Sequence, residues 1–240
     1  MSVKKYFSTG EWLKEVKKQV IECNKNNKVP ILVGGTGLYF NAIVKGISKI
    51  PNIKLEDRIS IRELHKKIGQ EKFYKKLLSL DPLVKNKFLP TDTQRTIRAF
   101  EVKKITKKSL YEWVSNTKSD FLDYDIKKIY LDIPREELLK NISKRTKKMF
   151  HEKCIDEVKN FIKLNVEKSL SAHKLIGVKE ISDHLSGLIT LVQAKELINI
   201  KTRQYAKRQN TWSRGHMKNW NKLYSKDFTV LAKKILKVIS

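Results

Sequence analysis

The residues best suited to chemistry stand in the segment 34–37, which reads Gly-Gly-Thr-Gly. It follows the apolar run 29–33 and precedes the mainly apolar segment 38–44, an order that predicts a strand buried on both faces, a turn and a helix. Glycines let backbone amides approach an anion, and a helix N-terminus adds a favourable dipole. We therefore expect an anion to bind here, with the Thr36 hydroxyl free to bond a phosphate or a substrate amine.

The same segment also fits a simpler reading. A tight strand-to-helix turn needs glycines even where nothing binds, and the residues alone do not separate the two cases. No GxxxxGK[ST] pattern occurs anywhere in the chain, so the segment is not a Walker-type loop.

A second candidate is the group formed by Gln94, Arg95 and Arg98. The two arginines are three residues apart, so they flank one face of a helix near its positive end. Two guanidinium forks suit a phosphate backbone, and the Gln94 amide offers a donor and an acceptor to a base. A solvated charged face is the alternative, and it accounts for most arginine pairs on helices.

The third candidate is a basic and aromatic helix near the carboxyl end of the chain. Arg203 and Lys207 share one face of it, whereas Tyr205, Arg208 and Trp212 fall on another. Interleaved cations and aromatic rings are typical of RNA contacts, in which phosphates pair with the charges and splayed bases stack on the rings. The two rings could instead be core anchors with cations arranged around them.

Composition narrows the function without deciding it. The 240 residues hold 52 Lys and Arg against 25 Asp and Glu, a formal net charge of +27 that favours polyanionic partners. A general bias towards Lys explains part of this excess. Cys23 and Cys154 form no CxxC pattern, and the five histidines show no ligand spacing, so we expect no metal bound by protein side chains alone. With no membrane span and no signal peptide, the sequence predicts a cytoplasmic protein.

The elements that must position these residues follow an α/β pattern with a helical interruption. A helix is predicted over 9–26, and a second strand over 127–133, which Pro134 ends. Between them, short polar helices break at Gly69, Pro82 and Pro90.

Two capping boxes and a series of later helices complete the expected elements. Thr91 with Gln94 is expected to start a helix that runs through residue 105, and Ser109 with Glu112 to start the next one. Everything after Pro134 is predicted to be helical, with helices over roughly 134–150, 155–168, 177–185, 190–214 and 227–239. We assign 1–51 and 121–240 to an α/β core and 52–120 to a helical insertion.

Taken together, these segments resemble the tRNA dimethylallyltransferase family. The matching segments, in chain order, are Pro30–Phe40, Asp81-Pro82, Gln94–Arg98 with Ala99 and Glu101, Ile176–Glu180 and Thr202–Trp212. Several motifs in one order are more specific than any one of them, and the likeness extends from about Ser2 to Trp220.

The resemblance implies a fold and a reaction. The fold is a P-loop-NTPase-like parallel-sheet core, related to nucleotide-binding proteins, with a helical insertion that holds the anticodon stem-loop of tRNA. The reaction transfers a dimethylallyl group from dimethylallyl diphosphate, with Mg²⁺, to N6 of the adenine 3′ of the anticodon. The enzyme is expected to be a monomer that contacts no membrane.

The resemblance also gives roles to individual residues. It makes Thr36 the catalytic residue near the adenine, and Gly34, Gly35 and Arg203 the phosphate-binding residues. The residues implied to bind tRNA are Arg58, Gln94, Arg95, Arg98, Lys174, Lys179, Lys207, Arg208, Gln209 and Trp212.

The chain departs from the family pattern in one missing segment and at individual residues. The family's Walker-type loop, and the aspartate that follows it, have no counterpart in this sequence, so we expect an N-terminally truncated core with the run 29–33 exposed at a sheet edge. The loss of such phosphate-binding groups commonly lowers a rate by about 10²–10³. Lys153 stands where the family usually has glycine.

Two other functions stay open at this point. The chain could be a catalytically inactive remnant that still binds the anticodon stem-loop. It could also be an unrelated basic RNA-binding protein whose motifs match by chance.

Overall fold

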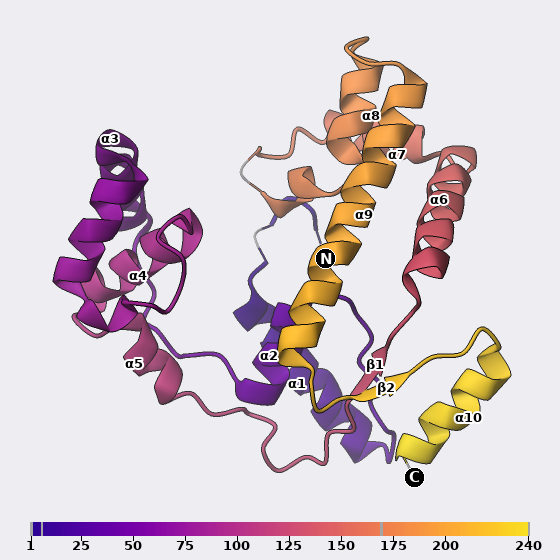
Figure 1. Cartoon of the computed structure of the whole chain (residues 1–240), viewed down its shortest axis with the longest axis horizontal. Coiled ribbons are helices and arrows are strands. Elements are labelled where there is room, and N and C mark those ends of the chain that lie inside the picture. The colour runs from indigo at the N-terminus through magenta and orange to yellow at the C-terminus, as the bar shows by residue number, and fades with distance from the viewer. Residues whose placement is uncertain (1, 6, 169, 240) are drawn as a thin grey trace. The chain divides into compact units, whose positions relative to one another are not determined.

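The computed structural model describes residues 2–5, 7–168 and 170–239. The chain divides into two compact units, each described here by itself (Figure 1). Unit 1 comprises residues 1–38 and 125–240, and unit 2 comprises residues 39–124. The range 52–120, predicted as a helical insertion, lies within unit 2, and its role as an insertion stays a prediction.

Unit 1 contains most of the helices and both strands. Its elements are α1 (Thr9–Lys25), β1 (Ile129–Leu131), α6 (Arg135–His151), α7 (Cys154–Lys163), the 3₁₀ helix η2 (Ser171–Lys174), α8 (Val178–Leu185), α9 (Leu191–His216), β2 (Asn221–Leu223) and α10 (Phe228–Ile239). The two strands pair in parallel, with Ile129 opposite Asn221 and Leu131 opposite Leu223. The fold is therefore a helix-rich α/β arrangement with a small parallel sheet, as predicted.

The long helix α9 organises the rest of unit 1, because α6 and α8 both pack against it (Figure 1). A cluster of buried side chains from α7, α8 and α9 joins them: Cys154, Val158, Ile181 and Ile198. Each fully buried isoleucine of this kind stabilises a fold by roughly 2–3 kcal/mol. Thr146 of α6 adds a hydrogen bond of 2.8 Å to the Asn199 side chain of α9. These contacts hold one face of α9 against the neighbouring helices and leave its opposite face free.

The predicted buried strand at 29–33 is wrong as a strand. The segment has no regular partner among the described residues, and Val29 and Val33 are 80% and 91% exposed. A strand keeps its form only where its N–H and C=O groups pair with neighbouring strands, and the only ladder of the described sheet joins β1 to β2. The segment is exposed, but it forms no edge of the described sheet, so the expected edge strand is wrong as well.

Two other expectations for unit 1 need correction. The chain after Pro134 is not wholly helical, because β2 pairs with β1; the short polar sequence of β2 carries no strand signal of its own. Helix α7 ends at Lys163 rather than at 168, since Asn165 takes a left-handed conformation with φ of 47°. Helices α1, α6, α8, α9 and α10 fall where they were predicted, within two residues at each end.

Unit 2 is helical. It contains nearly all of α2 (Gly37–Lys45), and then α3 (Leu55–Leu80), the 3₁₀ helix η1 (Pro82–Val84), α4 (Thr93–Thr106) and α5 (Leu110–Ser115). Its core joins α3, η1 and α4, and the Phe73 and Phe100 rings lie 4.7 Å apart within it. Gly69 interrupts α3 with φ of 76°, which confirms the predicted break.

The two capping boxes predicted for unit 2 have different outcomes. Ser109 and Glu112 form theirs: the Glu112 carboxylate accepts a 2.6 Å hydrogen bond from the Ser109 amide. The Thr91 box is wrong. Helix α4 begins at Thr93, so Asp92 is the residue placed to cap it, and its carboxylate accepts from the Arg95 amide at 3.1 Å.

No helix in the described part of the chain combines the length and the apolar character that crossing a membrane requires.

Lys153 offers a test of local strain in unit 1. It precedes α7 in the left-handed conformation, with φ of 55° and ψ of 21°, at a position where the resemblance described above leads us to expect glycine. A side chain in that region costs about 1 kcal/mol, so Lys153→Gly is expected to raise the free energy of unfolding by about that amount in urea denaturation. The matched variant Lys147→Gly, in the interior of α6, is expected to lower it by about 1 kcal/mol. Equal destabilisation by both variants would contradict the strain argument.

Candidate functional site

The glycine-rich turn at 34–37 lies directly against α9. The side-chain amide of Gln209 donates a 2.7 Å hydrogen bond to the Gly35 carbonyl. A Cβ added at Gly35 would collide with this amide, and one added at Gly37 would collide with the Trp212 ring. The close approach of the Trp212 ring therefore requires glycine at position 37, whereas at position 35 the flexible end of the Gln209 side chain would have to move. Neither contact could be read from the sequence.

Thr36 is presented by this turn. Its side chain is exposed, and no described residue forms a hydrogen bond with its hydroxyl. The next residue, Gly37, begins α2, so Thr36 stands at the positive end of a nine-residue helix. A free hydroxyl fixed in this position can donate to a phosphate oxygen or accept from an amine, which are the two roles that the sequence left open.

A second set of contacts holds the same end of α9 in place. The Tyr130 hydroxyl, on β1, donates a 2.6 Å hydrogen bond to the Asn210 side chain. Burial raises the pKa of Tyr130, and the nearby negative charge of Asp132 raises it further. The phenol therefore stays a protonated donor at neutral pH. The Trp212 ring stacks on His216 with centroids 4.3 Å apart. Sequence reasoning missed Tyr130 and Asn210, because a pair 80 residues apart leaves no local pattern.

The three cations of α9 that the sequence singles out are exposed to solvent. Arg203, Lys207 and Arg208 are exposed, and none forms an ion pair with a described acidic residue. The Arg208 guanidinium lies 5.7 Å from the centre of the Tyr205 ring, as their shared helix face suggests. Tyr205 is exposed rather than a core anchor, and Trp212 is only half-buried, so both rings retain surface on which a base could stack.

The segment Ile176–Glu180 is built around a buried carboxylate. Glu180 accepts a 2.8 Å hydrogen bond from the Gly177 amide and an ion-paired hydrogen bond from Lys201 of α9. Burial alone would raise the pKa of Glu180, but these donors outweigh it and hold the pKa below its ordinary value. Lys201 was missed by sequence reasoning, and its role is to join α8 to α9.

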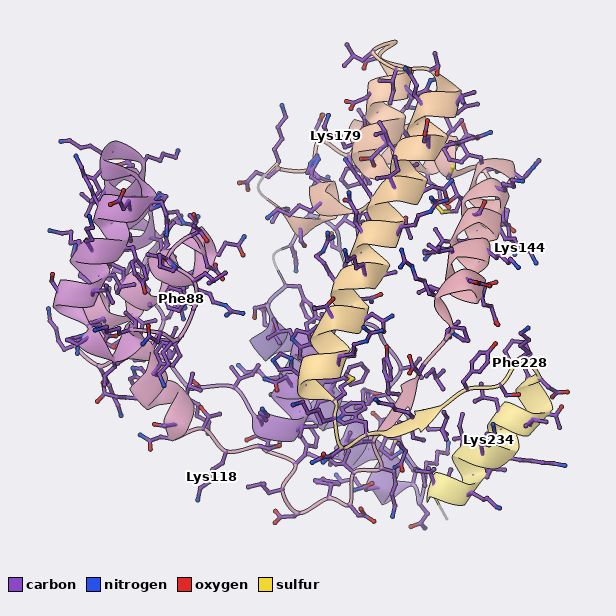
Figure 2. All side chains as sticks on the ribbon, viewed as in Figure 1. Phe88, Lys118, Lys144, Lys179, Phe228 and Lys234 are labelled. Carbon is purple, nitrogen blue, oxygen red and sulfur yellow. The ribbon has the colours of Figure 1, made fainter. Side chains whose placement is uncertain are left out.

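The two predicted contact lysines of this region differ in their surroundings. Lys174 is exposed in η2 and forms no ion pair with a described residue. Lys179 is exposed on α8 (Figure 2), and its ammonium lies 2.6 Å from Asp183. An exposed pair of this kind contributes little to stability and can exchange for another anion.

The remaining candidates belong to unit 2. Gln94, Arg95 and Arg98 lie on the first turns of α4, and Arg58 lies on α3. Arg95 is mainly exposed and 3.4 Å from the Asp92 carboxylate, and Arg98 is 3.4 Å from Glu101. These residues lie in a different unit from Thr36.

The described residues offer no cluster of three or more histidine, cysteine or carboxylate groups that could hold a metal ion. No carboxylate occurs within the turn at 34–37 or between Arg203 and Trp212. The residues present therefore do not fit a Mg²⁺ site built from protein ligands, and Mg²⁺ stays a prediction.

A comparison with known families decides the relationship. The family model described as IPP transferase matches residues 1–216, which include every candidate residue named above.

The chain belongs to the IPP transferase family.

Individual relatives agree with this assignment. The chain is 51% identical over 217 residues to a tRNA dimethylallyltransferase of Pelagibacter ubique, covering 90% of this chain and 69% of the relative. It is 38% identical over 220 residues to a protein of the same name from Wolbachia pipientis, covering 91% and 73%. Among solved structures it resembles the tRNA isopentenylpyrophosphate transferase of Bacillus halodurans, with a TM-score of 0.64, 28% identity and coverage of 99% and 73%.

The contact between Gly37 and Trp212 gives a direct test of the site's geometry. A methyl group in Gly37→Ala would overlap the indole, so the turn or α9 must shift. We expect a loss of about 1–3 kcal/mol in unfolding free energy and a changed near-UV circular dichroism spectrum. Gly215→Ala is the control, because Gly215 lies on α9, the helix that carries Trp212, and a Cβ there meets open space. The contact is disproved if the two variants behave alike.

Proposed function

We propose that this chain transfers a dimethylallyl group from dimethylallyl diphosphate to N6 of the adenine 3′ of the anticodon in tRNA. The observation that carries the proposal is the exposed Thr36 hydroxyl, held by a turn that packs on a cationic and aromatic helix. The names of the relatives, tRNA dimethylallyltransferase, support the same reaction.

The reaction requires positioning more than it requires an acid or a base. The N6 nitrogen of adenine attacks the allylic carbon while the bond from that carbon to the diphosphate oxygen breaks. The diphosphate leaves, and N6 then transfers a proton to solvent water. A neutral exocyclic amine is a weak nucleophile, so aligning it with the allylic carbon is a large part of catalysis. The base must also leave its stack to reach a protein site. In the proposal, the Thr36 hydroxyl accepts a hydrogen bond from N6 and fixes its direction of approach.

The proposal assigns donors from the turn and from α9 to the diphosphate. The backbone amides of Gly34 and Gly35 and the guanidinium of Arg203 are assigned to it in the proposal. Donors fixed before the reaction stabilise the charge that develops on the leaving oxygen.

The RNA contacts of unit 1 divide into exposed and packed residues. Lys174, Lys179, Lys207 and Arg208 are exposed cations that suit phosphates. Gln209 already donates to Gly35, and Trp212 already packs on Gly37, so in the proposal they contact RNA with the groups left over: the Gln209 carbonyl and the open part of the indole.

A catalytically inactive tRNA-binding remnant is the less favoured function, because the relatives are named as transferases. The monomeric state and the cytoplasmic location stay predictions.

Substitution of Thr36 tests the catalytic part of the proposal. Thr36→Ala removes the hydroxyl and leaves the glycines and α9 unchanged. We expect the rate of dimethylallyl transfer to fall by about 10²-fold, while the Kd for tRNA changes less than threefold, since the hydroxyl acts on the reacting amine. Thr229→Ala, an exposed threonine of α10, is the control and should change neither quantity. Equal losses in rate and binding would make Thr36 a turn residue only.

The RNA-binding part is tested on α4. The double variant Arg95→Ala with Arg98→Ala removes two cations that are assigned to phosphates. We expect weaker tRNA binding and a plot of log K against log salt concentration that is flatter by about 2, because each phosphate contact releases about one counterion. A filter-binding titration from low to high salt measures both. An unchanged slope would remove these arginines from the interface.

A further inference from the structure

A buried carboxylate links two arginines of unit 2. Glu101 lies on α4, and its side chain is only 5% exposed. Nη1 of Arg98, on the same helix, is 3.4 Å from Oε2 of Glu101. Nε of Arg62, on α3, is 4.0 Å from the other oxygen, Oε1. One carboxylate therefore faces guanidinium groups that come from two helices.

The charges of this cluster do not balance. A buried carboxylate is costly unless a cation compensates it, which explains why arginines face Glu101. Two guanidinium groups against one carboxylate leave one positive charge in excess. The Arg62 and Arg98 side chains are 61% and 38% exposed, and a guanidinium carries five N–H donors. Most of these donors are therefore free to bind an anion from solvent.

The hydrogen bonding of the cluster is also incomplete. Oε1 of Glu101 is buried and accepts no hydrogen bond from any described residue, since 4.0 Å to Arg62 is too long for one. Buried acceptors in native proteins are rarely left in this state. A small movement of the Arg62 guanidinium towards Oε1 would satisfy it and fix the fork. Arg58, one turn earlier on α3, has a buried Nε that also lacks an acceptor among the described residues.

We propose that Arg62 and Arg98 form a two-arginine clamp for RNA phosphates and that Glu101 is the positioning residue that holds both. Arg62 thereby becomes a contact residue that the motif-based assignment leaves out. Planar guanidinium forks held by a carboxylate suit bidentate binding of phosphate, which a flexible lysine does not provide. The inference rests on the proposed function, since it takes tRNA as the partner.

The first test replaces Arg62 alone. Arg62→Ala is expected to weaken tRNA binding about tenfold at moderate salt and to flatten the salt dependence by about 1. Lys67→Ala is the matched control: it removes one exposed charge from the same helix, five residues further along and therefore on a different face. If Arg62→Ala behaves as Lys67→Ala does, the clamp is disproved. If the unaltered chain itself fails to bind tRNA, the proposed function fails instead.

The second test asks whether Glu101→Gln strengthens or weakens tRNA binding. Glu101→Gln removes a negative charge near the RNA, so a purely electrostatic effect would tighten tRNA binding. A positioning role predicts the opposite, a several-fold weaker affinity together with a flatter salt slope. Circular dichroism melting establishes whether the variant is folded. If it is unfolded, the salt dependence of tRNA binding by Arg62→Ala decides whether the clamp exists. Tighter binding by a folded Glu101→Gln protein would overturn the positioning role.

Discussion

The close approach of the turn at 34–37 to helix α9 is the constraint on which the candidate site depends. Gly35 and Gly37 leave room for the Gln209 amide and the Trp212 ring, and neither position can take a Cβ without displacement. This contact joins residues that are about 170 positions apart in the sequence. It places Thr36 between two residues that contact α9, Gly35 at Gln209 and Gly37 at Trp212. A shift in the contact would separate the residue assigned to the reacting amine from those assigned to the phosphates.

Buried carboxylates perform a similar task in each unit. In unit 1, Glu180 binds the Gly177 amide and Lys201, and so fixes α8 on the helix that carries the site. In unit 2, Glu101 faces arginines from α3 and α4. Both residues belong to segments that match the family, and in both the carboxylate orders surface cations through contacts that a sequence does not reveal. A net charge of +27 supplies attraction for RNA, but these carboxylates decide where some of the cations point.

Much of the fold could be predicted from sequence because its signals are local. The apolar spacing of α1 and the capping box at Ser109 depend on residues within a few positions of one another, and both are confirmed. The run 29–33 was misjudged because a buried strand depends on neighbours that periodicity does not supply. Strand β2 was missed because Asn221–Leu223 pairs only through the backbone of β1. For the site, residue types and motif order indicated Thr36 and the cations of α9, whereas Tyr130, Asn210, Lys201 and Arg62 enter only through contacts between distant segments.

The central claim is that this turn and helix carry out dimethylallyl transfer to tRNA. The most direct measurement mixes the purified chain with dimethylallyl diphosphate, Mg²⁺ and unmodified tRNA, and then identifies the nucleosides by mass spectrometry. The account predicts N6-dimethylallyl adenosine, formed at the position 3′ of the anticodon and absent when the diphosphate is omitted. Intact tRNA binding without any modified nucleoside would contradict the claim and leave the chain as an RNA-binding protein.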